Sequence, residues 1–130
     1  MFLSYSSSNL NEAEALANEL KCHGVSVWFD RWEIHPGDSW IDSIEKYLTQ
    51  VKYLLILIGN DYKSLFENAY MRSFFRKCTR NKVTIVPIIL KSFNSNLILP
   101  VFLRDLMYVD LRSEKNFFED LLKKLNLEEL

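Results

Sequence analysis

The run Tyr53-Leu54-Leu55-Ile56-Leu57-Ile58 is apolar at every position and shows no alternation between apolar and polar residues. That pattern is typical of a central strand in a parallel sheet, where helices cover both faces. Gly59-Asn60-Asp61 follows the run and predicts a sharp end to the strand. We therefore expect side chains on both pleat faces of this strand to be buried, Leu55 on one face and Ile56 on the other.

Strand and helix patterns alternate on either side of this run. β-Branched and aromatic stretches predict further strands at residues 2–5, 25–29, 83–89 and 108–111. Helical spacing of apolar residues predicts helices over about 11–23, about 39–49 and from Ser64, a short turn at 102–106 and a last helix from Ser113. This order predicts an α/β, flavodoxin-like fold in a single domain over residues 1–130. Its doubly wound parallel sheet would have five strands in the order 2-1-3-4-5, with helices on both faces.

Composition narrows the class of protein. The chain has 130 residues, of which 48% are hydrophobic and 25% charged, and its formal net charge is −1. A nearly neutral chain argues against a surface devoted to nucleic acid, and no apolar run has the length of a membrane span. Without a signal peptide, we expect a cytoplasmic protein in which Cys22 and Cys78 are reduced thiols. Neither these cysteines nor His23 and His35 have metal-ligand spacing, so no metal is expected.

The expected topology predicts a ligand crevice beyond the carboxyl ends of strands one and three, where the winding of the sheet reverses. Residues 5–9 and 59–64 would form its walls, and the loop after the second strand would lie beside it. Charged and aromatic side chains crowd that loop, as is typical of binding loops on a rigid scaffold. They are Asp30, Arg31, Trp32, Glu33, His35 and Trp40.

The residues alone leave the chemistry of this crevice open. The chain contains no G-x-S-x-G elbow, no phosphate-binding loop and no glycine-rich dinucleotide motif. The serines at positions 6–8 could supply a nucleophile or donors for phosphate, but polar loop filler is the commoner role. Trp32 and Trp40 could stack on a nucleobase, and Trp40 could equally pack against its helix.

Six stretches resemble, in order, the signature boxes of bacterial TIR (Toll/interleukin-1 receptor/resistance protein) domains. They are Phe2-Leu3-Ser4-Tyr5-Ser6, Val27-Trp28-Phe29-Asp30, Pro36-Gly37-Asp38-Ser39-Trp40, the third strand with Asp61-Tyr62-Lys63-Ser64, Pro87-Ile88, and Tyr108-Val109-Asp110. Each stretch alone is weak evidence for the family, but together they occur in the family's order and span essentially the whole chain. The resemblance implies the flavodoxin-like fold. It also implies homotypic TIR–TIR assembly through the Pro-Gly loop, here Ile34, Pro36, Gly37 and Trp40.

Many bacterial TIR domains are NAD+ glycohydrolases, so the resemblance implies NAD+ as a substrate and no separate cofactor. In the family, a glutamate in the helix after the third strand contacts the nicotinamide ribose and supports cleavage of the nicotinamide–ribose bond. The motif puts this position at Ala69 in the register we prefer, or at Tyr70 in the alternative, and neither residue is acidic. Glu67 would face away from Ala69, because two residues along a helix are rotated by about 200°. Alanine here fits either a substituted glutamate or a naturally non-catalytic domain.

Two functions follow from the resemblance. The first is an NAD+-cleaving effector of bacterial antiviral defence or immune signalling, inactive in this form because the catalytic glutamate is absent. Its crevice would be lined by Tyr5, Ser6, Asp30, Trp32 and Lys63. The second is a non-catalytic module that signals through TIR–TIR assembly. Either would work with a sensor domain or a partner subunit. A receiver-like domain of the same fold is a weaker alternative, because Ser4-Tyr5-Ser6 lacks an acidic cluster.

Overall fold

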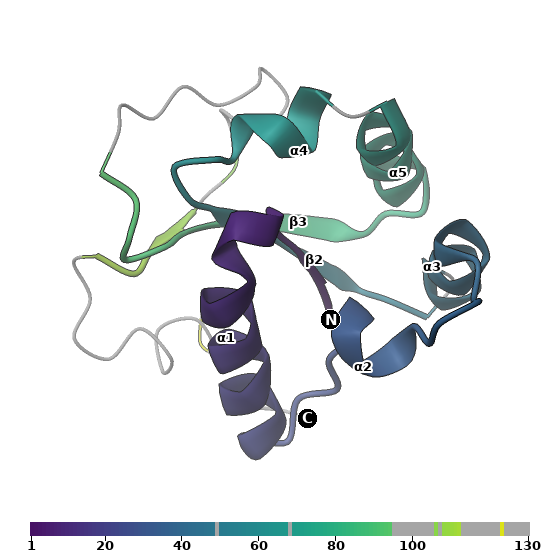
Figure 1. Ribbon diagram of the computed structural model, residues 1–130, viewed down its shortest axis with the longest axis horizontal. Coiled ribbons are helices and arrows are strands. Elements are labelled where there is room, and N and C mark those ends of the chain that lie inside the picture. The colour runs from purple at the N-terminus through teal and green to yellow at the C-terminus, as the bar shows by residue number, and fades with distance from the viewer. Residues whose placement is uncertain (49, 68, 95–105, 107, 113–122, 124–130) are drawn as a thin grey trace.

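The computed structural model describes residues 1–48, 50–67, 69–94, 106, 108–112 and 123. Strands and helices alternate along the chain from the first residues onward (Figure 1). The elements are β1 (Phe2–Ser4), the 3-10 helix η1 (Ser7–Asn9), α1 (Leu10–Cys22), α2 (Asp30–Glu33), α3 (Trp40–Leu48), β2 (Tyr53–Ile58), α4 (Lys63–Glu67), α5 (Ala69–Arg80), β3 (Thr84–Ile89) and β4 (Val109–Asp110).

The sheet is parallel and has the strand order β1-β2-β3-β4. Strand β2, the apolar run on which the prediction rested, pairs along its whole length with β3 and along three residues with β1. Its residues from Leu54 to Ile58 are all 0% exposed. The prediction that both faces of this strand are buried is therefore confirmed.

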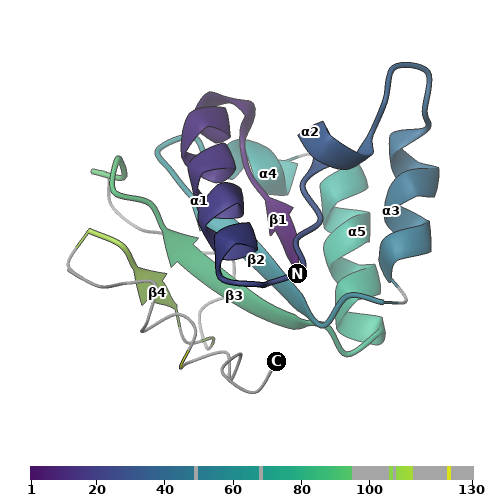
Figure 2. The ribbon, with the colours of Figure 1, turned by 90° about the horizontal axis from the view of Figure 1, so that it is seen from below.

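Two apolar clusters occupy the two faces of the sheet. Helix α1 covers one face, where Leu16 and Leu20 pack with Leu55 and Leu57 of β2. Helices α3, α4 and α5 cover the other face, where Leu54 and Ile56 join Phe2, Trp28, Ile44, Leu65, Phe74 and Cys78. Figures 1 and 2 show this three-layer arrangement, with the strands between α1 on one side and α4 and α5 on the other. The alternation of β2 side chains thus divides one apolar run between two cores.

The second predicted strand, at residues 25–29, does not form a strand. It makes one isolated parallel bridge, between Phe2 and Trp28, in which Trp28 N–H donates to Met1 O over 2.7 Å and Leu3 N–H donates to Trp28 O over 3.4 Å. Strand β1 is only three residues long and α2 begins at Asp30, so little room remains for a ladder. The segment lies beside β1, but the described sheet has four strands and the five-strand order is not established.

The helix predicted from Ser64 is divided into α4 and α5. The helix was predicted to begin at Ser64, but Ser64 lies inside α4, and its hydroxyl donates to Asp61 O over 2.9 Å. Arg72 of α5 donates from Nη1 to the carbonyl oxygens of Phe66 and Glu67, each over 3.3 Å, and so caps the end of α4. The predicted turn at 102–106 and the helix from Ser113 lie essentially outside the described residues.

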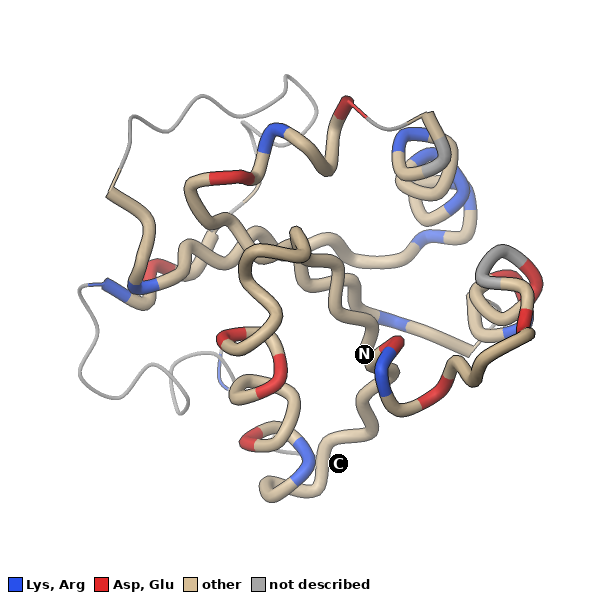
Figure 3. The backbone as a smooth tube through the Cα atoms, in the orientation of Figure 1, with Lys and Arg blue, Asp and Glu red and all other residues tan. Residues whose placement is uncertain are grey.

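Charges are distributed unevenly over the helices (Figure 3). Helix α5 carries Arg72, Arg76, Lys77 and Arg80 and no acidic residue. Lys77 Nζ lies 2.7 Å from Glu45 Oε1 of α3, which joins the two helices at the surface. Such exposed pairs contribute little to stability. In the described part of the chain, no helix is long and apolar enough to cross a membrane.

Candidate functional site

Tyr5 and Asp30 form the first polar pair at the carboxyl end of β1. The Tyr5 hydroxyl donates to Asp30 Oδ1 over 2.6 Å, and the same oxygen accepts the Arg31 backbone N–H over 2.9 Å. Burial and then the neighbouring Asp30 carboxylate raise the pKa of Tyr5 above its usual range. Tyr5 therefore stays protonated and acts as a donor. Among the described residues, Asp30 Oδ2 takes no hydrogen bond, so this oxygen can accept one from a ligand.

A small cavity of about 60 Å³ adjoins this pair. The cavity lies between β1, α2 and the first turn of α5. Its lining includes Ser4, Tyr5, Trp28, Asp30 and Met71. The Ser4 hydroxyl is buried and has no hydrogen-bond partner among the described residues. A buried hydroxyl without a partner is costly, which suits a place where a polar ligand group enters.

A second polar group links the end of β1 with the end of β2. Ser6 Oγ donates to Asp61 Oδ2 over 2.9 Å, and Ser8 Oγ reaches the same oxygen over 3.5 Å. Ser64 Oγ lies 3.4 Å from Ser6 Oγ. The Asp61 carboxylate thus orders two of the serines that the sequence left open. Ser6 Oγ hydrogen-bonds with one carboxylate and two hydroxyls, and we interpret these contacts as structural.

The Asn9 side chain packs against Gly59, beside the serine group. Asn9 is only 7% exposed, and its Nδ2 donates to Glu12 Oε1 over 3.3 Å. A methyl group added at Gly59 would lie 2.3 Å from Asn9 Oδ1 and 2.7 Å from Asn9 Cγ. Glycine is therefore required at position 59 by close packing, at the point where β2 leaves the sheet.

We expect Gly59→Ala to lower the free energy of unfolding by about 1–3 kcal/mol, because the buried Asn9 amide must move. Chemical denaturation measures this change. Removing the obstructing amide with Asn9→Ala makes a matched test, since the double variant should lose less stability than the sum of the two single variants. Strict additivity would show that the contact between Gly59 and Asn9 is not the cause.

Ala69, the preferred position of the family glutamate, is the first residue of α5 and is exposed. Met71, two residues further on, lines the cavity beside Asp30. Tyr70 follows Ala69 in α5, and its side chain is outside the described set. Glu67 ends α4 and is exposed, so it belongs to a different helix from Ala69. Lys63 begins α4 with an exposed side chain.

Trp32 lies on the α1 side of the sheet. Its ring packs edge-on against Phe29, with centroids 5.2 Å apart, and Lys21 Nζ lies 5.2 Å from the Trp32 centroid. It is a partly buried neighbour of the core that α1 covers, and the lining of the small cavity does not include it. The geometry therefore gives Trp32 a packing role.

The connection from α2 to α3 extends away from the helices (Figure 2). Pro36 and Gly37 are exposed at its tip, and Gly37 has φ +93°. Ile34 was predicted to take part in assembly through this loop, which requires an exposed side chain, but it is partly buried against the core that α3 and α5 cover. Trp40 begins α3, and its side chain is outside the described set.

No group of three or more potential metal ligands occurs among the described residues. Cys22 and Cys78 are both free, the first exposed and the second buried, and burial raises the pKa of the Cys78 thiol to about 12. The sequence reasoning did not single out Ser4, Asp61 or Met71 as site residues. Asp61 could have been found, because it follows directly after the break that ends the central strand.

Comparison with known proteins gives concordant results. The family model for the TIR domain (TIR_2) matches residues 1–125. NAD(+) hydrolase PdTIR from Paracoccus denitrificans (strain Pd 1222) is 30% identical over 76 residues, which are 58% of this chain and 25% of that protein. The chain thus spans about a quarter of the length of this relative.

The fold also matches a solved structure. It is the crystal structure of the TIR domain of the Toll-related receptor TRR-2 from Hydra magnipapillata, with a TM-score of 0.75 and 16% sequence identity. The match covers 96% of each chain, and at this identity it speaks for the fold alone. Because the family model matches residues 1–125, which is nearly the whole chain, this protein belongs to the TIR domain family.

Proposed function

We propose that this TIR domain is of the NAD+ glycohydrolase type, which cleaves the nicotinamide–ribose bond, and that Ala69 occupies the catalytic glutamate position. The observation that carries the proposal is the start of α5. Residue 69 opens this helix, and Met71 in the same turn lines the cavity that Tyr5 and Asp30 also line. Residue 69 is rotated by about 200° from Met71, so it is exposed and is not part of that lining. The relationship to an NAD(+) hydrolase supports the same reaction class.

The Tyr5–Asp30 pair has the chemistry to hold a ribose. A protonated tyrosine keeps one carboxylate oxygen of Asp30 engaged over 2.6 Å, which fixes the orientation of the carboxylate. Its second oxygen can accept a hydrogen bond from a ribose hydroxyl. Charge-assisted bonds of this kind are about twice as strong as neutral ones. We assign Asp30 to substrate positioning, with Tyr5 as the residue that orients it.

Apart from Asp30, which we assign to the ribose, the described carboxylates near this site do not take the place of the missing glutamate. Glu67 is exposed at the end of α4, and Asp61 is engaged by Ser6 and Ser8. Cleavage develops positive charge at the anomeric carbon, and a carboxylate beside that carbon stabilises it. We therefore expect the chain with alanine at position 69 to bind the substrate without turning it over. NAD+ consumption by an Ala69→Glu protein tests the proposal.

The size of the cavity favours a site completed by a second copy. A volume of about 60 Å³ is far below the roughly 300–1,000 Å³ of pockets that hold drug-sized ligands. Most of a dinucleotide would therefore lie over exposed surface. The projecting Pro36-Gly37 tip supports homotypic TIR–TIR assembly as the source of the remaining walls. We further infer a cytoplasmic effector in antiviral defence or immune signalling, controlled by a sensor domain or partner subunit, on the strength of the family resemblance.

The second candidate function is a non-catalytic module that acts only through TIR–TIR assembly. The absence of an acidic side chain at positions 69 and 70 favours it. Both functions require assembly, but only the first requires turnover once a glutamate is present at position 69.

We expect Gly37→Phe to abolish concentration-dependent assembly. Its φ of +93° disfavours a side chain, so the tip must change conformation, while no atom lies within 4 Å to disturb the fold. Gly24→Phe is a matched control, because Gly24 also has a positive φ (+80°) and open space but lies after α1. Sedimentation velocity over a range of concentrations measures the outcome. Equal assembly by Gly37→Phe and wild type would make the loop a bystander.

A further inference from the structure

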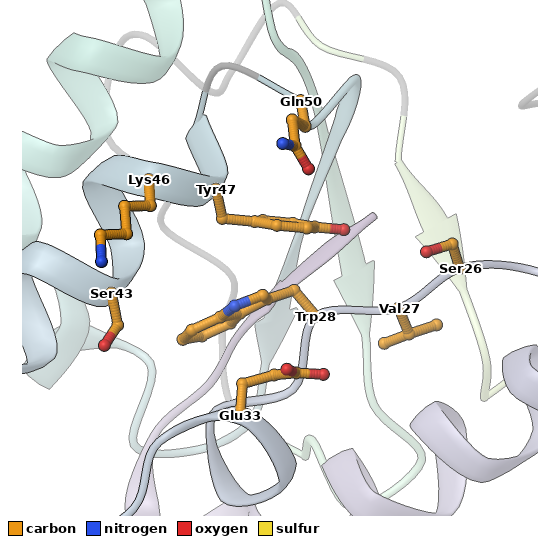
Figure 4. Close-up of a pocket in the computed structure, with 8 residues that line it drawn as sticks. All are labelled: Ser26, Val27, Trp28, Glu33, Ser43, Lys46, Tyr47 and Gln50. Atoms are coloured by element: carbon orange, nitrogen blue, oxygen red, sulfur yellow. The ribbon is translucent and has the colours of Figure 1, made fainter. Parts of the chain in front are cut away.

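A second pocket lies at the edge of the sheet, on the side where residues 25–29 lie beside β1. Its volume is about 270 Å³, and Trp28, Glu33, Ser43, Lys46 and Tyr47 are among its lining residues. Figure 4 shows the Trp28 and Tyr47 rings one above the other, with Glu33 below them and Lys46 and Ser43 to one side. The pocket is slightly smaller than those that hold drug-sized ligands, so an amino-acid-sized molecule would fill it.

Trp28 presents the edge of its indole ring to this pocket. The residue as a whole is only 5% exposed, and its N–H is not among the buried polar atoms left without a partner. One face of the ring stacks on Phe2, with centroids 4.7 Å apart and an interplanar angle of 9°, and Tyr47 lies 5.9 Å away. Because the faces are covered, Trp28 offers its edge and its N–H, which match an oxygen acceptor and exclude binding of a cation on the ring face.

The walls of the pocket carry charges of opposite sign. Glu33 ends α2 and Lys46 lies in α3, and both are exposed. Burial raises the pKa of Tyr47, and the nearby Glu33 carboxylate raises it further, while Ser26 opposes the shift. The Tyr47 hydroxyl accepts a hydrogen bond from the amino group of Met1 over 3.3 Å, so the phenol is held in place. A ligand with a single net charge would meet one attractive and one repulsive group.

We propose that this pocket binds a small zwitterion of the free α-amino-acid class. The ligand carboxylate would accept hydrogen bonds from the Trp28 N–H and the Lys46 ammonium, and the ligand ammonium would donate to the Glu33 carboxylate. Both ends of the ligand then form charge-assisted hydrogen bonds, and the indole N–H adds a neutral one. The proposal does not depend on NAD+ cleavage.

The pocket shares structure with the candidate functional site. Trp28 lines both this pocket and the small cavity beside Asp30. The single turn of α2 begins with Asp30 and ends with Glu33, so its two acidic ends belong to the two sites. A bound amino acid would therefore contact both Trp28 and helix α2, which the two sites share. Binding in this pocket could in this way change the position of Asp30 in the small cavity.

Calorimetric titration of the chain with each of the twenty L-amino acids tests the proposal. We expect at least one to bind with a dissociation constant of about 1 mM or tighter. We expect Lys46→Met and Glu33→Gln each to weaken amino-acid binding at least about tenfold. Both side chains are exposed, so neither substitution disturbs the core. Lys52→Met removes another exposed lysine, one that does not line the pocket, so the affinity of this variant for the amino acid should be unchanged.

The N-acetylated carboxamide of the same amino acid is the matched ligand control, because it keeps the side chain and lacks both charges. It should not bind at about 10 mM. The proposal is overturned if none of the twenty amino acids binds at that concentration, or if Lys46→Met and Glu33→Gln bind as wild type does. Equal binding of the neutral derivative would also overturn it.

Discussion

NAD+ consumption by an Ala69→Glu protein is expected to exceed that of the Ala69 protein by at least about 100-fold. Preorganised electrostatic stabilisation of a developing charge contributes on the order of 10²–10³ in rate. Residue 69 starts α5 and is exposed, so a glutamate there would not enter the core. Residues 69 and 71 are rotated by about 200° on the helix, so this glutamate would meet the substrate over the exposed surface and not inside the small cavity that Met71 lines. Nicotinamide release, followed by chromatography at high protein concentration, measures the outcome.

Ala69→Gln is the control, because glutamine has the shape of glutamate and lacks its charge. It should remain at the level of the Ala69 protein. Tyr70→Glu tests the alternative register in the same assay, and only one of the two positions should give activity, since neighbouring residues on a helix are rotated by about 100°. Glu67→Gln in the Ala69→Glu background should have little effect, because Glu67 lies in α4.

Asp30→Asn, made in the Ala69→Glu protein, tests whether Asp30 positions the substrate or only supports the fold. The amide keeps an acceptor for Tyr5 but lacks the negative charge that we assign to ribose binding, so KM should rise with little change in unfolding. No turnover by either glutamate variant, at high concentration and with an activating partner present, would leave TIR–TIR assembly as the function. If a glutamate variant is active, Gly37→Phe tests whether the active site needs two copies of the chain. Loss of assembly should then remove activity only if a second copy completes the site.

The parts of the fold that rest on long apolar runs could be predicted from the sequence. Residues 53–58 form β2 as expected, because a strand buried on both faces leaves a continuous pattern that no loop shows. Residues 25–29 have a similar β-branched and aromatic composition, yet they form a single bridge beside the short β1. Val25, Trp28 and Phe29 are buried and Val27 is partly buried, and the apolar pattern indicates this burial. Pairing depends on the partner strand, which local composition does not encode.

The break between α4 and α5 was not predictable, because residues 64–80 contain neither proline nor glycine. Its cap comes from Arg72, which reaches back to carbonyl oxygens five and six residues earlier, a spacing that helical periodicity does not reveal. Ser6 was expected at the crevice, but its partner Asp61 lies 55 residues away in the sequence. Topology brings strand ends together, and it does not specify which side chains then meet.

Truncation of either Leu55 or Ile56 to alanine is expected to lower the free energy of unfolding by about 2–5 kcal/mol. Both side chains are 0% exposed, and they face different cores. Leu55 packs in the cluster that α1 covers, and Ile56 packs in the cluster that α3 and α5 cover. Each substitution leaves a cavity in one core only, so the two costs report on the two faces of the sheet independently. Guanidinium denaturation followed by far-UV circular dichroism measures both.

Ile85→Ala is the matched control, because Ile85 pairs with Leu54 from the adjacent strand β3 but is only partly buried. It should cost less than either β2 substitution, since part of its surface is already in water. A loss of about 5 kcal/mol is a large part of the free energy of unfolding of a typical small domain. The Leu55→Ala and Ile56→Ala proteins should therefore also have lower melting temperatures. If one of the two cost no more than Ile85→Ala, the helices on that face would not be packed against β2. The residues that β1 and α5 bring to the small cavity would then lose the common support that holds them together.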